Sequence, residues 1–274
     1  MKELIKHNGI TQLLNDLYLQ YKTKDVDTYV FVATTGRSGS LSLTHLFSEV
    51  SDCISTHEPY PIMTNFEIEE NAGKKLSIYK KKSIYIKRAA QNNRIYIETN
   101  HLFIKNFYDL ILNSFNMDKL KLIHLIRPCC EVALSFYSIN SIPGKSERGK
   151  NYLLSPSRAD NEINIPELLD LEGEFSHDFY KCLWYWYEIE SRTKKCKLLF
   201  PQVKWFELKT KELNDRKQIE KLCCFIGVNF EEVSTMVGVK KNLKKEEKIN
   251  VVDFNAEDMS DNFKSLLISK GYSI

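Results

Sequence analysis

The sequence predicts an α/β protein built as a three-layer sandwich, with helices on both faces of a central, mostly parallel β-sheet. Short apolar runs rich in β-branched residues alternate along the chain with longer segments of helical periodicity, which is the pattern of such a sheet. The chain has 274 residues, of which 43% are hydrophobic, enough to bury one full core. We therefore expect a single domain over residues 1–274, with its core at about 28–230.

The expected elements alternate between strand and helix in chain order. The connection 141–173, which contains Pro143-Gly144 and Ser155-Pro156, interrupts the alternation. A connection of that length inside a compact domain is either a lid or substrate loop, or an unstructured surface insertion. Strands are predicted at 29–34, 53–57, 94–99, 120–126 and 202–207, and helices at 40–50, 74–92, 105–116, 129–140, 176–196, 212–226 and 256–269.

The first strand and the first helix enclose a turn rich in glycine and serine, here called the glycine loop (residues 34–40). Gly36 and Gly39 let the backbone approach a ligand closely, and the amide groups of Leu41 and Ser42 at the helix start attract an anion. The Lys-Ser or Lys-Thr pair of a Mg-ATP loop is missing. The loop therefore predicts a site for phosphate or sulfate without magnesium.

A second pattern, at the fourth strand, predicts another anion contact. Arg127 ends the strand, Pro128 suits the first turn of a helix, and Ser135 follows eight residues after Arg127. Arginine offers a permanently charged, bidentate grip on phosphate, and serine adds a hydroxyl donor. If the helix folds back over the strand, both side chains face one ligand.

These two motifs resemble those of the sulfotransferases that use 3′-phosphoadenosine 5′-phosphosulfate (PAPS), a family with a P-loop NTPase-like fold. The strand 203–208 and the helix ending at Gly227 extend the resemblance to about residues 29–230. The resemblance implies transfer of the sulfuryl group from PAPS to a hydroxyl or amine, leaving adenosine 3′,5′-bisphosphate. It also implies that the donor is bound by Arg37, Ser38, Gly39, Ser40, Leu41 and Ser42 at the 5′-phosphosulfate and by Arg127 and Ser135 at the 3′-phosphate.

Sulfuryl transfer needs a cation for the charge on the bridging and leaving oxygens, and a base for the acceptor proton. Arg37 suits the first role. Glu58 lies 21 residues after Arg37, the separation at which the resemblance to the tyrosylprotein sulfotransferases implies a catalytic glutamate. His101 lies 26 residues before Arg127 and resembles the catalytic histidine of the cytosolic sulfotransferases, with Thr-Asn-His in place of Lys-Thr-His.

We expect Glu58 to be the base and His101 to be a second catalytic or acceptor-orienting residue. The alternatives are a surface carboxylate or acceptor contact for Glu58, and a helix-cap or core histidine for His101. Glu98 is a candidate for an internal ion pair near Arg127.

The sequence does not identify the acceptor, and a sugar, a lipid glycan, a small alcohol and a peptide tyrosine all stay open. Among these classes we expect a carbohydrate or a small hydroxylated metabolite. Acceptor contacts are expected after Pro59, in the 141–173 connection and in the aromatic stretch 183–187, which is equally typical of a core. Lys240 and Lys241 belong either to a solvated basic face or to the nucleotide site.

Composition excludes several other classes of protein. A net charge of +3 suits an anionic donor but is too small to indicate nucleic acid, and no spaced cluster of metal ligands is present, so we expect no metal. No signal peptide and no apolar run of ~20 residues is seen, so a cytoplasmic protein without membrane insertion is expected. Two alternatives stay open, a P-loop-type small-molecule kinase and a non-catalytic nucleotide-binding module, and the oligomeric state is not indicated.

Overall fold

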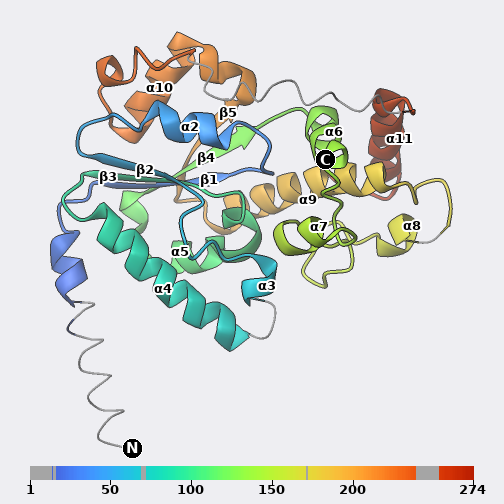
Figure 1. The fold of residues 1–274 in the computed structure, drawn as a ribbon, viewed down its shortest axis with the longest axis horizontal. Coiled ribbons are helices and arrows are strands. Elements are labelled where there is room, and N and C mark those ends of the chain that lie inside the picture. The colour runs from blue at the N-terminus through green and yellow to red at the C-terminus, as the bar shows by residue number, and fades with distance from the viewer. Residues whose placement is uncertain (1–13, 15–16, 69–71, 171, 239–252) are drawn as a thin grey trace, which may run out of the picture.

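The computed structural model describes residues 14, 17–68, 72–170, 172–238 and 253–274. Five parallel strands form one sheet in the order β2-β3-β1-β4-β5 (Figure 1). The predicted α/β class is confirmed, and each strand lies within two residues of its expected position. The strands are β1 (Thr28–Ala33), β2 (Cys53–His57), β3 (Ile95–Thr99), β4 (Leu120–Ile126) and β5 (Lys204–Lys209).

Seven α-helices match the expected ones: α2 (Ser40–Leu46), α4 (Ala72–Ala90), α5 (Tyr108–Ser114), α6 (Cys129–Ser138), α9 (Asp178–Leu199), α10 (Arg216–Ile226) and α11 (Ala256–Ser269). The short helices α3 (Asn65–Ile68), α7 (Glu147–Tyr152) and α8 (Pro166–Asp170), the π-helical turn η1 (Phe103–Phe107) and the 3-10 turns η2 (Met117–Lys119), η3 (Thr210–Asn214) and η4 (Phe230–Glu232) were not expected. Within the described residues, no helix combines the length and apolar character that a membrane span requires.

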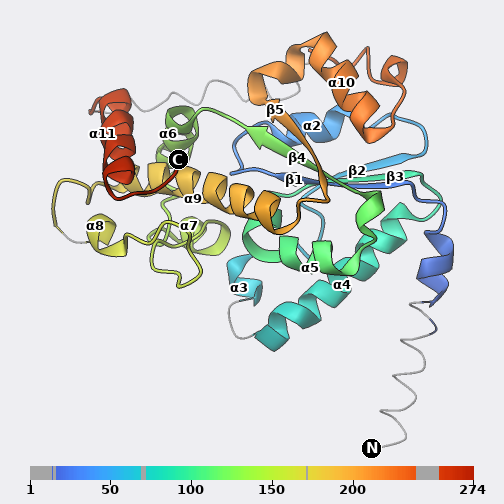
Figure 2. The same cartoon turned by 180° about the vertical axis from the view of Figure 1, so that it is seen from behind.

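The central strand β1 shows why the molecule has three layers. Tyr29, Phe31 and Ala33 belong to a core on one face of the sheet, and Val30 and Val32 belong to a separate core on the other. Successive side chains of a strand point to opposite faces, so a strand buried on both faces reads as a continuous apolar run. Helices α2 and α10 cover one face, while α4, α5 and α9 cover the other, as the rear view also shows (Figures 1 and 2).

The described part of the 141–173 connection is folded. Of the two alternatives for this connection, the unstructured surface insertion is therefore wrong. It contains α7 and α8, and five apolar side chains between them and around them are buried in the core beneath the sheet. The apolar residues of this connection follow neither a helical nor a strand period. Burial of these side chains, rather than local propensity, therefore fixes the conformation of the connection. These buried side chains are Ile142, Leu153, Leu154, Ile163 and Ile165.

Glu98 does form an internal ion pair, but its partner is not Arg127. Glu98 is fully buried in β3 and pairs instead with Lys82 of α4, at 2.7 Å, and it also accepts a hydrogen bond from Tyr96 at 2.7 Å. Arg127 follows β4, two strands away in the sheet. A buried carboxylate needs a close charge partner, and the helix packed on that face supplies one.

Candidate active site

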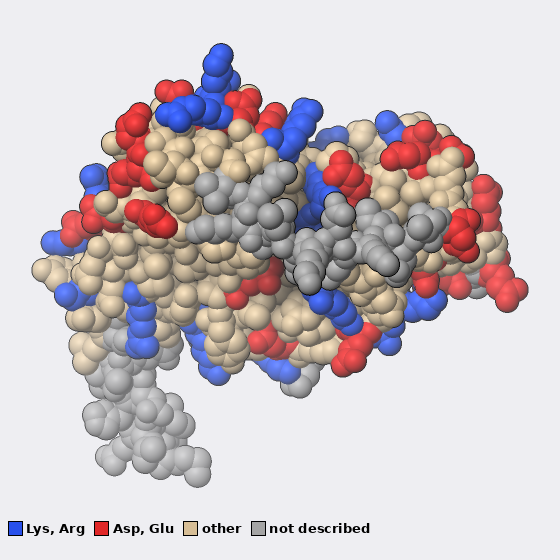
Figure 3. Space-filling view, turned by 45° about the horizontal axis from the view of Figure 1, so that its top comes forward, with Lys and Arg blue, Asp and Glu red and all other residues tan. Residues whose placement is uncertain are grey.

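Four of the five strands are followed by predicted site residues at their carboxyl ends. The glycine loop follows β1, Glu58 follows β2, His101 follows β3 and Arg127 follows β4, while Thr210, which the sequence did not single out, follows β5. In open α/β sheets ligands bind outside the carboxyl ends of the strands. This end of the sheet is therefore the natural place for a ligand. Figure 3 shows Lys and Arg side chains scattered among Asp and Glu over one face of the molecule, with a few of them near its middle.

Positive backbone φ angles shape the glycine loop. Gly36, Arg37 and Gly39 have φ of 83°, 56° and 89°, which turns the chain sharply between β1 and α2. Glycine adopts this conformation freely, whereas for Arg37 it costs about 1–2 kcal/mol. Inside the loop the hydroxyls of Thr35 and Ser38 lie 2.8 Å apart, and Ser38 donates to the carbonyl of Gly36 at 3.0 Å. Side-chain hydrogen bonds thus hold a strained turn in place.

Contacts from distant parts of the chain anchor the same loop. The Tyr185 hydroxyl on α9 donates to the carbonyl of Thr35 at 2.7 Å, and Thr210 donates to the carbonyl of Ser38 at 2.7 Å. Lys105 of η1 donates in turn to the Tyr185 hydroxyl at 2.9 Å. The shape of the loop is therefore held by hydrogen bonds from the protein itself.

The two predicted phosphate-binding motifs, the glycine loop and the pair Arg127 and Ser135, are in direct contact. Arg37 Nε donates to Ser135 Oγ at 2.8 Å, and Arg127 Nη1 donates to the carbonyl of Arg37 at 2.8 Å. Trp186 fixes the strand end by donating to the carbonyl of Arg127 at 2.8 Å. Arg127 Nε also pairs with the exposed Glu131 at 2.9 Å. Helix α6 thus folds back so that Arg127 and Ser135 face the glycine loop, the arrangement that their spacing suggested.

Glu58 and His101 form a hydrogen-bonded pair beside the loop. Glu58 Oε1 lies 2.5 Å from His101 Nδ1, and its backbone amide donates to the carbonyl of Thr99 at 3.2 Å. The His101 ring lies against Gly36, where a Cβ atom would stand 3.3 Å from Cγ and Cδ2 of the ring. The two residues that the sequence proposed as alternatives for the base are therefore one unit, in contact with the glycine loop.

The surroundings of this pair set its protonation. Burial alone would raise the pKa of Glu58, but the hydrogen bond from His101 and nearby positive charge, including that of Lys105, lower it to about 2. Burial and the charge of Lys105 lower the pKa of His101 below its usual value, and Glu58 offsets this only in part. At neutral pH Glu58 is an ionised carboxylate, which only accepts hydrogen bonds. Nδ1 of the neutral His101 must therefore carry the proton, which leaves a lone pair on Nε2.

The remaining predicted donor contacts lie at the start of α2. Ser40, Leu41 and Ser42 form its first turn after Gly39. Lys240 and Lys241 lie outside the described residues. Within the residues that the structure does describe, no group of three or more His, Cys, Asp or Glu side chains is placed to hold a metal ion.

Sequence reasoning missed Lys105, Tyr185 and Thr210. Lys105 is the one charged residue in the apolar segment 102–107, and its side chain is only 3% exposed. A lysine inside a buried run is the signal that points to it, because such a residue must find partners in the interior. Tyr185 belongs to the aromatic stretch 183–187, for which the sequence leaves acceptor contacts and a core role open. It is fully buried, and its hydroxyl donates to the glycine loop.

Replacing Gly36 by alanine is expected to reduce turnover more than stability. The substitution adds backbone strain of about 1–2 kcal/mol and pushes on the His101 ring. Gly227→Ala is the matched control, because Gly227 has φ of 99° and no atom within 4 Å of the new Cβ. Thermal melting should show similar losses for both variants, and turnover should fall only for Gly36→Ala. Normal turnover in that variant would contradict the placement of His101 against the loop.

Comparisons with known proteins show the same fold over nearly all of the chain. The family model described as a sulfotransferase domain matches residues 27–271. The sulfotransferase domain of an olefin synthase from Synechococcus PCC 7002 is 15% identical, with a TM-score of 0.54, covering 91% of this chain and 96% of that one. A sulfotransferase from Alicyclobacillus acidocaldarius is 15% identical, with a TM-score of 0.52, covering 90% and 97%.

A third similar structure is the sulfotransferase domain from the curacin biosynthetic pathway, at 14% identity and a TM-score of 0.51, covering 91% of this chain and 99% of that one. No significant match was found among the curated proteins. At identities this low, the solved structures show only that the fold is shared.

Proposed function

The chain belongs to the sulfotransferase domain family, and we propose that it transfers the sulfuryl group of PAPS to a hydroxyl or amine of a small acceptor. The observation that carries the proposal is the convergence of the glycine loop, Arg127 with Ser135, and the Glu58–His101 pair at one edge of the sheet. These groups supply an anion cradle, a second phosphate grip and a proton acceptor, which are what the reaction needs.

The glycine loop and α2 would hold the 5′-phosphosulfate. Arg37 would face the oxygen that bridges phosphorus and sulfur, where negative charge develops as the sulfur–oxygen bond breaks. Arg127 and Ser135 would hold the 3′-phosphate, with Arg127 exchanging its contact to Glu131 for the ligand. PAPS is thus expected to be bound through its 5′-phosphosulfate and its 3′-phosphate, without a metal ion.

His101 is the better base of the pair, which reverses the roles that the sequence favoured. A carboxylate with a pKa of about 2 is a weak proton acceptor, whereas a histidine kept neutral by its surroundings is ready to accept. In the proposed step the acceptor oxygen bonds to sulfur, its proton passes to Nε2 of His101, and adenosine 3′,5′-bisphosphate leaves. Glu58 holds Nδ1–H and stabilises the imidazolium that forms.

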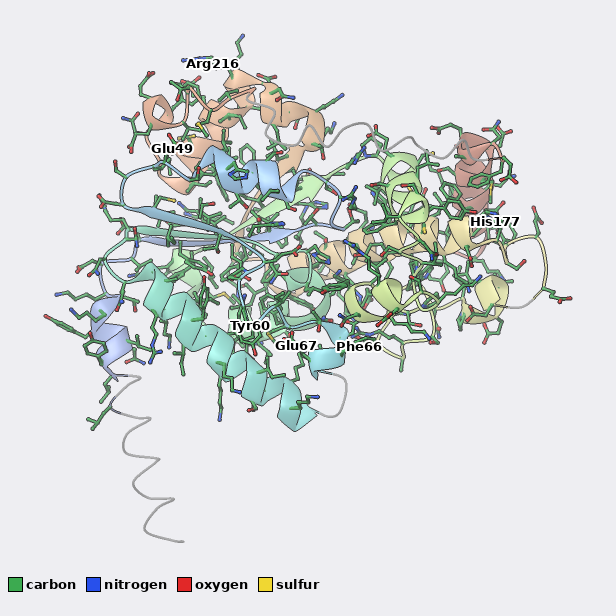
Figure 4. All side chains as sticks on the ribbon, viewed as in Figure 1. Glu49, Tyr60, Phe66, Glu67, His177 and Arg216 are labelled. Atoms are coloured by element: carbon green, nitrogen blue, oxygen red, sulfur yellow. The ribbon has the colours of Figure 1, made fainter. Side chains whose placement is uncertain are left out.

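The acceptor is proposed to be a carbohydrate or a small hydroxylated metabolite. Two segments expected to bind it are in contact, because the Asn65 side chain donates to the carbonyls of Lys150 and Leu153, at 2.8 and 2.7 Å. Tyr60 and Phe66 lie on the same side of the molecule and are 72% and 49% exposed (Figure 4). Exposed aromatic rings suit contact with the apolar face of a sugar.

The pH dependence of kcat/KM follows from the state of His101. Turnover needs neutral His101, so the rate falls as the pH drops through the pKa of His101, which burial places below the usual value for histidine. Glu58 raises that pKa, so Glu58→Gln should move the acidic limb to still lower pH while slowing turnover. A limb that moves upward, or does not move, would contradict this assignment.

The experiment that tests the function is transfer of ³⁵S from labelled PAPS to a panel of sugars, phenols and small alcohols. Label should appear in at least one acceptor without added metal, and the Arg37→Ala variant should lose this transfer. Binding of PAPS with no transfer to any acceptor would favour a non-catalytic nucleotide-binding module. Phosphate transfer from Mg-ATP would favour a kinase.

A further inference from the structure

A cavity of about 470 Å³, lined largely by charged side chains, lies against α5, α9 and the 158–162 segment. Neither the loop nor the Glu58–His101 pair lines it. Its walls carry three carboxylates and five cationic side chains, so it has an excess of positive charge. The cations are Lys75, Lys105, Arg158, Arg192 and Lys195.

Four of the five cations are balanced by carboxylates within the structure. Lys75 lies 3.5 Å from Asp109, and Lys195 lies 2.6 Å from Glu162. The other two pairs are Arg158 with Asp160 at 2.8 Å and Arg192 with Glu188 at 2.6 Å. These charges need no ligand.

Lys105 is the exception. Its ammonium donates to the carbonyl of Tyr152 at 2.7 Å and to the Tyr185 hydroxyl at 2.9 Å, and both of these acceptors are neutral. Among the described residues, none of its hydrogen bonds or ion pairs is to a carboxylate, and Glu58 acts on its charge only at longer range. An ammonium carries three N–H donors, so one remains after these two bonds.

A buried cation without a counter-ion is costly, and the side chain of Lys105 is only 3% exposed. Burial and the charges of Arg158 and Arg192 lower its pKa well below the usual value. An anion in the cavity would offset this cost, because it would pair with the Lys105 ammonium and favour its charged form.

We propose that this cavity binds a small ligand through an anionic group, a carboxylate or a phosphate or sulfate ester, that contacts Lys105. The cavity volume suits a ligand of metabolite size. The anionic group belongs either to a free metabolite or to an acidic acceptor. Lys105 also donates to Tyr185, and Tyr185 donates to Thr35 of the glycine loop. A ligand that moves Lys105 would therefore also change the contacts of that loop.

The test follows the Lys105 side chain directly by NMR of protein labelled in its lysine side chains. The Lys105 signal is identified by its loss in Lys105→Met, and the titrations use inorganic phosphate and glucuronate, with glucose as the neutral probe. The protein carries Arg127→Ala, so that the proposed donor site takes up less phosphate. We expect a saturable shift of the Lys105 signal with both anions, and a rise in the Lys105 pKa of about one unit or more.

Lys197→Met is the matched control, because Lys197 lies two residues beyond Lys195 on the same helix but pairs with Glu207 outside the cavity. Calorimetry should show anion binding kept in Lys197→Met and lost in Lys105→Met. Absence of a shift at Lys105 up to about 50 mM anion, far above the concentration at which a millimolar site would fill, would overturn the proposal. So would equal binding by the two variants.

Steady-state kinetics distinguish whether the anionic group belongs to the acceptor or to a separate metabolite. Phosphate that competes with an acidic acceptor, with a raised KM for that acceptor in Lys105→Met, would mean that the cavity holds part of the acceptor. Inhibition or activation that does not compete would mean a separate metabolite, and both results support the site. The NMR titration needs no turnover, so failure of this proposal is distinguishable from failure of the proposed sulfuryl transfer.

Discussion

Replacing His101 by asparagine is expected to lower kcat by about 10²–10⁴-fold while leaving the binding of adenosine 3′,5′-bisphosphate nearly unchanged. The asparagine amide can still donate to Glu58 in the way that Nδ1–H does, but it cannot accept a proton. The loss should therefore fall on the chemical step. Single-turnover kinetics with PAPS and calorimetry with the bisphosphate measure the two effects separately.

Glu58→Gln and His57→Asn complete the comparison. Glu58→Gln should cost about a hundredfold in kcat, because the glutamine cannot stabilise the imidazolium. His57 bonds Thr99 at 2.8 Å and stands 3.9 Å from Glu58, so His57→Asn should have a much smaller effect. Near-normal turnover in His101→Asn with complete loss in Glu58→Gln would make Glu58 the base, the role that the sequence favoured.

Replacing Arg127 by alanine is expected to weaken the binding of adenosine 3′,5′-bisphosphate by about a hundredfold, which corresponds to ~2.7 kcal/mol of binding free energy. The charged, two-pronged contact to the 3′-phosphate is lost, while the contacts of Ser135 and the glycine loop remain. Adenosine 5′-phosphosulfate has no 3′-phosphate, so its binding should change little. Calorimetric titration of the variant with both ligands measures this selectivity.

Glu131→Gln is the control for that result. Glu131 occupies Arg127 Nε at 2.9 Å, and removing its charge should strengthen the binding of the bisphosphate. Equal losses for both nucleotides in Arg127→Ala would instead mean that the variant disturbs the glycine loop, whose Arg37 carbonyl accepts from Arg127. The 3′-phosphate assignment would then be wrong.

The sequence predicted the sheet and the main helices well because their signals are local. A strand buried on both faces, such as β1, reads as an apolar run, and α10 has an apolar stripe that ends at Gly227 in the left-handed conformation. The same local patterns placed Arg37, Arg127 and Ser135, since each stands at a fixed distance from a strand end. The contacts among them were then supplied by the fold.

What the sequence could not supply depends on contacts between distant segments. Glu98 finds Lys82 rather than Arg127 because α4 packs on that face of the sheet, and nothing in the local pattern reports this packing. The π-helical turn that carries Lys105 and the irregular burial of the 141–173 connection likewise arise from the core they join. The protonation of His101 and Glu58 follows from their mutual contact and from burial, so the roles of the two residues could not be separated from the sequence.

Calorimetric titration with adenosine 3′,5′-bisphosphate, run beside Mg-ATP, tests the central claim most directly. The account predicts micromolar binding of the bisphosphate without metal, and little binding of Mg-ATP, because the glycine loop lacks the lysine of a Mg-ATP loop. Tight, magnesium-dependent binding of ATP with no response to the bisphosphate would contradict both phosphate assignments and favour a kinase.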